Sequence, residues 1–458
     1  MGSTESMERH AHTRIGKVIV ALICLIPMLA AVGYGAVDAF ALGVIFVLAL
    51  VVAALWLVDA INSGEFRFSS DVIQLPLLGL ILIAVVQLLP LSSGDVPPDL
   101  VSVATARALS ADPYATRFFL IQLIVYFIFF AAALNYIPGG DRPKKVAIAI
   151  VLFGAVLAFA GILQRLSTPD AIYGLRRTPQ AISFGPFVNQ HHFAALMEMT
   201  SGVALGILFG SGTKREHKVV VALAAGIMGM AIIFTGSRGG LIGYLCVVAF
   251  SAVASFVRSS TYHQDPDATD RRKRNLYVLI AAGGLVVLVL ASVLFLGGEG
   301  SLIRSIGMGN TQSDPTSGRA HFWSVGWMIF LANPILGSGL NSFGVVFTKF
   351  DTWNGFYRVE QAHNDYLQML ADGGILGIAC VAAFIILYLR RAVLAIGERR
   401  EGIRRGIVTG ALAGTLGILI HSFFDFPLRT PANSFFFLLL VVVVVGHGGT
   451  RHRHRSAR

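Results

Sequence analysis

Long apolar runs separated by short polar segments repeat along almost the whole chain of 458 residues. A helix rises about 1.5 Å per residue, so roughly 20 apolar residues cross a hydrocarbon core of about 30 Å. About twelve runs are long enough to do so once helix tilt is allowed for. They cover residues 15–33, 38–58, 72–90, 117–137, 145–164, 191–211, 218–236, 239–257, 276–297, 373–390, 404–424 and 431–447.

This pattern predicts an all-α fold, a polytopic integral membrane bundle of about 12 transmembrane helices. The composition agrees, because only 13% of the residues are charged, against roughly 25% in soluble domains. We expect a disordered cytoplasmic N-terminus (1–14), a single transmembrane domain (15–447) and a basic cytoplasmic tail (448–458). Many further runs follow the first one, which we therefore interpret as a retained helix rather than a signal peptide.

The distribution of lysine and arginine predicts the orientation. With the N-terminus in the cytoplasm and alternating loops, most of the 36 Lys and Arg residues fall on the cytoplasmic side. They include the clusters DRPKK (141–145), KREHK (214–218), RRKR (271–274) and RHRHRSAR (451–458). The net charge of +11 therefore indicates topology and contact with anionic lipids rather than nucleic acid.

The long loops all fall on the opposite, outer side of the membrane. They span residues 91–116, 165–190 and 298–362, and long loops on one face of a rigid bundle often carry function. The segment GRAHFWSVGWMIFLA (318–332) has helix-like apolar spacing and is expected to lie along the membrane surface.

Polar residues unusual for so apolar a chain gather at the predicted outer ends of the helices. Ionisable groups at membrane depth are costly and usually functional, so stretches that share one side point to a site there. The six stretches are YGLRRTP (173–179), FVNQHH (187–192), GSRGG (236–240), SGRAHFW (317–323), AHNDYLQ (362–368) and HSFFDFPLRTPAN (421–433).

Arginines in three of these stretches are candidate phosphate ligands, because the guanidinium fork matches phosphate oxygens. Arg238 lies in a very short turn whose flanking glycines allow close approach of the backbone. Arg319 begins the amphipathic segment. The alternative for both is an arginine that reaches the lipid headgroups or solvent. Arg176 and Arg177 are adjacent in a loop, where a solvated pair and a ligand pair fit the sequence equally well.

His363 is the candidate proton acceptor, since a neutral imidazole near pH 7 can take a proton from a hydroxyl. Asn364 or Asp365 would orient the ring or the acceptor. The glycines in ADGGILG (371–377) allow a bend or close helix packing. A purely structural histidine is the alternative.

The remaining polar residues have structural alternatives. His191 and His192 can cap their helix, Asp425 can be a turn residue, and Glu198 can pair with a histidine or arginine inside the bundle. No DxD-like acidic pair lies in an outer loop, and no HExxH or CxxC motif occurs, so we predict no metal site and no other cofactor. Arginines would then neutralise an anionic leaving group electrostatically.

These segments resemble the O-antigen ligase and O-antigen polymerase superfamily of bacterial inner-membrane glycosyltransferases. The resemblance covers roughly residues 160–445 and departs from the family in one place. Members often carry NxNH-like spacing where this chain has Asn189, Gln190, His191 and His192. It rests on SRGG (237–240), SGR followed by a Trp (317–323), NPILGSGLNSF (333–343), AHNDYLQMLADGGILG (362–377), FVNQHHFAALMEM (187–199) and HSFFDFPLRTPAN (421–433).

The resemblance implies a metal-independent, inverting transferase with a periplasmic active site and a long periplasmic loop that contains short helices. The donor would be a glycan on undecaprenyl diphosphate and the acceptor a sugar hydroxyl. His363 would activate that hydroxyl, and Arg238 and Arg319 would hold the diphosphate, together with Arg176 and Arg177. The expected supporting residues are Asn364, Asp365, His421, Asn189 and His192.

Three functions remain open from the sequence. A polymerase extends a lipid-linked polysaccharide or exopolysaccharide, and a ligase moves the polymer to the lipid A core of lipopolysaccharide. Two segments, PFVNQHHFAALMEM and DFPLRTPAN, favour the polymerase. A flippase or transporter is the alternative of another class, but it predicts internal repeats and polar groups near the midplane. Expected partners are the lipid-linked donor, a lipid-linked or lipid A core acceptor, membrane lipids and other polysaccharide assembly proteins, but no nucleic acid.

Overall fold

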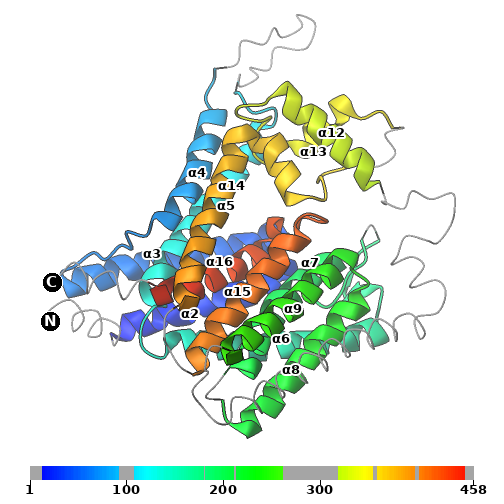
Figure 1. Ribbon diagram of the computed structural model, residues 1–458. Coiled ribbons are helices and arrows are strands. Elements are labelled where there is room, and N and C mark those ends of the chain that lie inside the picture. The colour runs from blue at the N-terminus through cyan, green and yellow to red at the C-terminus, as the bar shows by residue number, and fades with distance from the viewer. Residues whose placement is uncertain are drawn as a thin grey trace, which may run out of the picture.

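The apolar runs form helices in the computed structural model (Figure 1), which describes residues 13–91, 108–179, 181–210, 213–260, 318–353, 358–397 and 402–448. The expected span 276–297, both expected terminal segments up to residue 12 and from residue 449, and the first part of the outer loop lie outside these ranges.

The elements follow the hydropathy pattern closely. In chain order they are α2 (Arg14–Val32), η1 (Tyr34–Ala36), α3 (Ala39–Ser63), η2 (Val72–Gln74), α4 (Leu75–Gln87), α5 (Pro113–Tyr136), α6 (Arg142–Ser167), β1 (Ala171–Ile172), β2 (Arg176–Arg177), α7 (Gln190–Phe209), α8 (Arg215–Thr235), α9 (Arg238–Ser260), α12 (Arg319–Ala332), α13 (Phe343–Phe350), α14 (Asp365–Gly397), α15 (Ile403–His421), η3 (Pro427–Arg429) and α16 (Pro431–Gly448).

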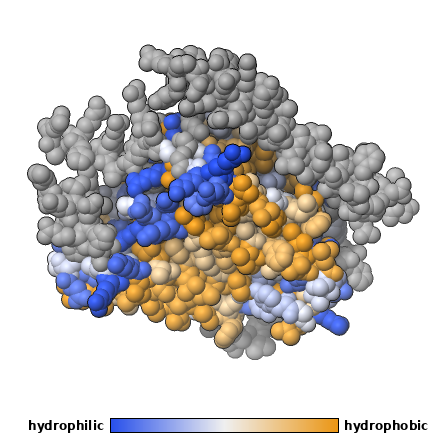
Figure 2. Space-filling model, turned by 90° about the horizontal axis from the view of Figure 1, so that it is seen from below, coloured by the Kyte–Doolittle hydropathy of each residue, from blue (hydrophilic) through white to orange (hydrophobic). Residues whose placement is uncertain are grey.

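Nine helices in the described ranges are long and apolar enough to cross a membrane, namely α2, α3, α5, α6, α7, α8, α9, α14 and α15. Two shorter apolar helices, Val72–Gln87 and Pro431–Gly446, account for two further runs. Figure 2 shows a broad apolar face on the bundle, with hydrophilic residues gathered in a band along one side. The chain is therefore a multi-pass helical membrane protein.

The centre of the bundle is the contact between α7 and α15, which are the most extensively packed pair of helices. A Cβ added at Gly206 of α7 would lie 2.2 Å from the carbonyl oxygen of Gly406 on α15. Gly202 approaches Gly414 in the same way. Glycine on both surfaces lets the backbones touch, as in close helix pairs of other membrane proteins.

The helix α14 is broken at Gly374, whose backbone (φ 62°, ψ −161°) is not helical. The bend expected from ADGGILG is therefore present. The loop at residues 333–341 enters this break. The N–H groups of Ser338 and Gly339 donate to the carbonyls of Ala371 and Asp372 at 3.0 Å. The segments NPILGSGL and ADGG thus form one interlocked unit.

The described part of the outer loop contains two helices, α12 and α13. Figure 1 shows them together beside the N-terminal part of α14, apart from the main bundle. They share a second hydrophobic cluster that includes Val325, Ile329, Phe343 and Phe347. The interlocked loop connects them, so this small unit is fixed to α14 rather than attached by a free linker.

We predict that Gly206→Ala destabilises the protein. The added methyl group must displace the backbone of α15, and overpacking of this kind costs about 1–3 kcal/mol. Thermal unfolding of the purified protein, followed by size-exclusion chromatography after heating, measures the loss.

The matched control is Gly226→Ala on α8, where an added Cβ meets nothing within 4 Å. We expect this variant to be as stable as the parent, or more stable, because Ala is the better helix former by about 1 kcal/mol. Equal stability of the two variants would contradict the packing argument.

Candidate functional site

A fully buried carboxylate, Asp425, is the centre of a polar cluster at one end of the helices. It is 1% exposed and lies in the turn between α15 and α16. The Nη2 atom of Arg319 lies 3.2 Å from Oδ2, and Nδ1 of His363 lies 3.3 Å from Oδ1. The Nε2 atom of His191 is 4.0 Å from Oδ2. Residues from three of the predicted polar stretches therefore contact one residue of a fourth stretch.

Backbone contacts fix the position of Asp425. Its N–H donates to the carbonyl of His421 at the end of α15, and its Oδ1 accepts from the N–H of Phe426. The carboxylate of Asp365 supports the same turn from α14. Its Oδ2 accepts from Ser422 Oγ at 3.0 Å and from the N–H of Leu428 at 3.2 Å.

The charge of Asp425 follows from these neighbours. Burial alone would raise its pKa, but the contact with His363 and the electrostatic influence of His191 and His363 outweigh burial and hold the pKa well below its usual range. The carboxylate is therefore ionised and holds the side chains around it through ion pairs and hydrogen bonds.

The backbone of His363 directs its ring at Asp425. The residue is left-handed (φ 50°), immediately before the N-terminus of α14. The side chain of Asn364 accepts from the N–H groups of Tyr366 and Leu367 and so caps this helix. Because Nδ1 faces the carboxylate, Nε2 is the nitrogen left for chemistry. No hydrogen bond joins Nε2 to another described residue.

Aromatic rings enclose the His363 imidazole on two sides. The ring of Phe426 meets it edge-on at 4.8 Å between centroids, and Phe322 stacks beside it at 5.9 Å. The His363 side chain remains 29% exposed. The ring is thus held in place while its outer side stays accessible.

The turn that carries Arg238 is joined to the same cluster through His191. The helix α8 ends at Gly236 (φ 66°), and Ser237 then accepts from the N–H of Gly240 through its Oγ. His191 Nδ1 lies 2.8 Å from the same Oγ. Arg238 follows at the start of α9 and is half-buried. One imidazole thus bridges the serine beside Arg238 and the carboxylate beside His363.

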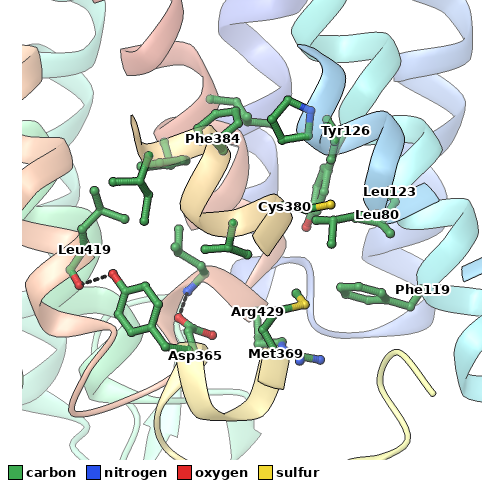
Figure 3. Close-up of a pocket in the computed structure, with 18 residues that line it drawn as sticks. Leu80, Phe119, Leu123, Tyr126, Asp365, Met369, Cys380, Phe384, Leu419 and Arg429 are labelled. Atoms are coloured by element: carbon green, nitrogen blue, oxygen red, sulfur yellow. Dashed lines mark hydrogen bonds between the residues drawn. The ribbon is translucent and has the colours of Figure 1, made fainter. Parts of the chain in front are cut away.

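A largely apolar cavity of about 190 Å³ lies between α4, α5, α14, α15 and α16 (Figure 3). Leu80, Phe119 and Cys380 contribute to its wall, and Asp365 and Arg429 are among its polar residues. Because Asp365 also supports the Asp425 turn, the cavity adjoins the polar cluster across that turn.

Residues 223–382 match the family model described as O-antigen ligase. The match covers about a third of the chain. The match confirms the resemblance to the O-antigen ligase and polymerase superfamily and supports an enzyme that transfers glycans. No curated protein gives a significant match to the chain.

The matched segment contains Arg238, Arg319 and His363, but Asp425 and His191 lie outside it. The site therefore needs α7 and the α15–α16 turn in addition to the family segment. Sequence reasoning placed neither Asp425 nor His191 among the site residues. The signal was present, because both lie in the quoted polar stretches.

Other predicted residues have different partners in the structure. Arg176 forms an ion pair with Asp38 and covers the ring of Tyr34 at 4.8 Å, whereas Arg177 is exposed. Arg176 thus contacts a carboxylate of the protein itself, and no contact joins Arg177 to the Asp425 cluster among the described residues. The diphosphate contacts of both arginines stay a prediction.

Several of the predicted supporting residues cap helices or hold turns in place. Asn189 caps α7 by accepting from the N–H of His191. The ring of His192 points in a different direction from that of His191, and its Nδ1 atom lies 2.6 Å from Oγ1 of Thr430. Asn364 or Asp365 was expected to orient the His363 ring or the acceptor. The carboxylate beside His363 Nδ1 is that of Asp425, and a role of Asn364 or Asp365 toward the acceptor stays a prediction. No group of three potential metal ligands occurs among the described residues.

We predict that Arg429→Met strongly destabilises the protein. Arg429 Nη2 lies 2.8 Å from Asp372 Oδ2, and this pair is 10% and 0% exposed. Removing the arginine leaves a buried charge in the interlocked unit of α14, which costs about 3–5 kcal/mol. Thermal unfolding in detergent tests the expectation.

Arg358→Met provides the comparison, because the pair of Arg358 and Glu360 is 76% and 63% exposed. An exposed pair of this kind contributes little to stability. The prediction fails if the two variants unfold at the same temperature.

Proposed function

We propose that the protein transfers a glycan from undecaprenyl diphosphate to an acceptor sugar hydroxyl at the periplasmic face. The observation that carries this proposal is the set of His363, Asp425 and Arg319 with the Arg238 turn beside it. A base oriented by a carboxylate and two arginines suited to phosphate lie at one end of the bundle. The family match supports glycosyl transfer of this general type.

In the proposed reaction His363 Nε2 takes the proton of the acceptor hydroxyl. Asp425, whose Oδ1 lies 3.3 Å from His363 Nδ1, favours the tautomer with the proton on Nδ1 and stabilises the imidazolium that forms. The hydroxyl oxygen attacks the anomeric carbon of the donor from the face opposite the diphosphate. The new glycosidic bond forms as the old C–O bond breaks, so the anomeric configuration inverts.

The bond electrons leave with undecaprenyl diphosphate, and negative charge grows on its bridging oxygen. Arg319 uses one of its five N–H donors on Asp425 and keeps others for the diphosphate. Arg238 extends from a turn held by Ser237 and His191. Such preorganised positive groups stabilise a leaving group without a metal ion.

The apolar cavity supplies a place for part of the polyprenyl chain (Figure 3). Its wall is built almost wholly of apolar side chains, and it reaches Asp365, two residues from His363. A chain bound there would keep the diphosphate at the end of the membrane where the arginines lie. The cavity thus links the hydrophobic and the charged part of one substrate.

Of the two transferase activities we favour the polymerase, on the segments PFVNQHHFAALMEM and DFPLRTPAN. A ligase that delivers polymer to the lipid A core would use the same cluster. Deleting the gene in the host and resolving carrier-linked and surface glycans on gels separates them. Single repeats on the carrier indicate a polymerase, and long chains kept on the carrier indicate a ligase. An unchanged profile, in a host without a redundant enzyme, contradicts both.

We predict that His363→Ala leaves the protein folded in the membrane and abolishes transfer. The general base is lost, while the ring is not part of the bundle core. Complementation of the deletion strain, with protein amount measured in the membrane fraction, provides the readout.

His217→Ala serves as the control, because His217 is exposed at the start of α8 and lies in the basic segment expected on the cytoplasmic side. It should restore the glycan profile fully. Near-normal glycan output from His363→Ala would refute the assignment of the base.

We further predict that Leu80→Trp raises the KM for lipid-linked donor about tenfold. The larger ring displaces about two methylene groups of the lipid, each worth about 0.8 kcal/mol. The assay uses purified protein in nanodiscs and lipid-linked glycan extracted from the deletion strain.

Leu82→Trp makes the same change on the same helix, at a side chain that is 63% exposed on the outside of the bundle. Its KM should match that of the parent protein. If both variants behave alike, the cavity does not hold the substrate.

A further inference from the structure

A fully buried pair of a carboxyl group and an imidazole lies inside the bundle, apart from the reacting groups. Nδ1 of His421 on α15 lies 2.8 Å from Oε1 of Glu198 on α7, and both side chains are 0% exposed. The remaining polar atoms, Oε2 of Glu198 and Nε2 of His421, are buried without a hydrogen-bond partner among the described residues.

Stability alone does not account for this pair. Desolvation of two charged or polar groups is costly, and a pair of this kind can often be replaced by apolar residues without loss of stability. Here two polar atoms also lack partners, which adds to the cost. Ionisable residues at such depth are functional by default.

His421 contacts both turns that carry proposed substrate-binding groups. Its carbonyl accepts from the N–H groups of Phe424 and Asp425. Its ring lies against Gly239, where an added Cβ would be 2.7 Å from Cδ2. Gly239 directly follows Arg238. One residue therefore lies against the turn of Asp425 and the turn of Arg238.

Glu198 lies on the same helix as His191, which belongs to the Asp425 cluster. The two residues are seven positions apart on α7, which corresponds to two turns and so to one face of the helix. Gly243 on α9 makes room for the carboxylate, because a Cβ there would be 2.5 Å from Oε2. The pair thus lies where α7, α9 and α15 meet.

We propose that the Glu198–His421 pair is a positioning element that sets the spacing between the Arg238 turn and the Asp425 turn. It fixes the rotation of α7 relative to α15, and it fixes the position of the His421 ring, against which Gly239 packs. The effect on catalysis rests on the function proposed above, but the effect on spacing does not.

The decisive variant replaces both members, Glu198→Leu with His421→Leu, so that no unpaired charge remains. We expect stability equal to or above that of the parent, with kcat at least tenfold lower, since displacement of reacting groups by about 1 Å costs about 10²-fold. The KM for extracted lipid-linked glycan should stay within about twofold, because ground-state binding in the cavity is unchanged.

Two further variants test separately the hydrogen bond within the pair and the position of the His421 ring. Glu198→Gln retains an oxygen that can accept from His421 Nδ1–H and should restore kcat to within about threefold of the parent. Gly239→Ala leaves the pair intact but pushes on the His421 ring, and should lower kcat as the double leucine variant does. Gly226→Ala is its matched control.

Spacing is measured independently of activity by spin labels at Phe234 and Phe423, which are 43% and 51% exposed near the ends of α8 and α15. The parent for labelling carries serine at Cys24, Cys246 and Cys380. We expect a single narrow distance in the parent, and a shifted or broader distribution in the double leucine and Gly239→Ala variants.

An unchanged distance distribution in the folded variants overturns the inference, whether or not the protein proves to be a transferase. Parent-like kcat in the double leucine variant, or a loss in Glu198→Gln as large as in that variant, also overturns it. An inactive parent protein with normal spin-label distances refutes instead the proposed function.

Discussion

The site depends on the contacts that the buried, ionised carboxylate of Asp425 makes with its neighbours. A charge buried at 1% exposure must be compensated, and the compensation comes from His363, Arg319 and His191. These residues lie on three different segments, and the turn between α15 and α16 brings the carboxylate to all of them. The same carboxylate that draws these residues together also orients the imidazole that we assign as the base. Organisation of the site and its chemistry therefore have one physical cause.

The bundle supplies the rigidity that this arrangement needs. Glycine on α7 and α15 lets the two backbones touch, so the helix that carries His191 is fixed against the helix that leads to Asp425. The break at Gly374 admits the loop at residues 333–341, and backbone hydrogen bonds close it. These contacts join backbone to backbone rather than through long, flexible side chains. The ends of the helices that carry the site therefore have little freedom to shift.

The position of the carboxylate partner divides the arginines into two kinds. Arg429 and Arg176 have carboxylate partners within the protein, Asp372 and Asp38, and their contacts hold the scaffold. Arg319 also touches a carboxylate, but that carboxylate is Asp425, which lies beside His363. We therefore propose as substrate ligands only arginines that the fold places next to the Asp425 cluster. Sequence reasoning had no means of separating these cases.

The sequence by itself determined the membrane-spanning class, the helices and the candidate residues His363, Arg238 and Arg319. Hydropathy over some 20 residues is a local property, and so are glycine and histidine motifs. The choice between His191 and His192 was different, because neighbours on a helix point about 100° apart and only packing decides which faces the site. The partner of His363 likewise came from 62 residues away, on a turn whose course is fixed by Asp365 and His421. Such contacts arise from the tertiary structure, since no local pattern records which distant carboxylate a buried imidazole will meet.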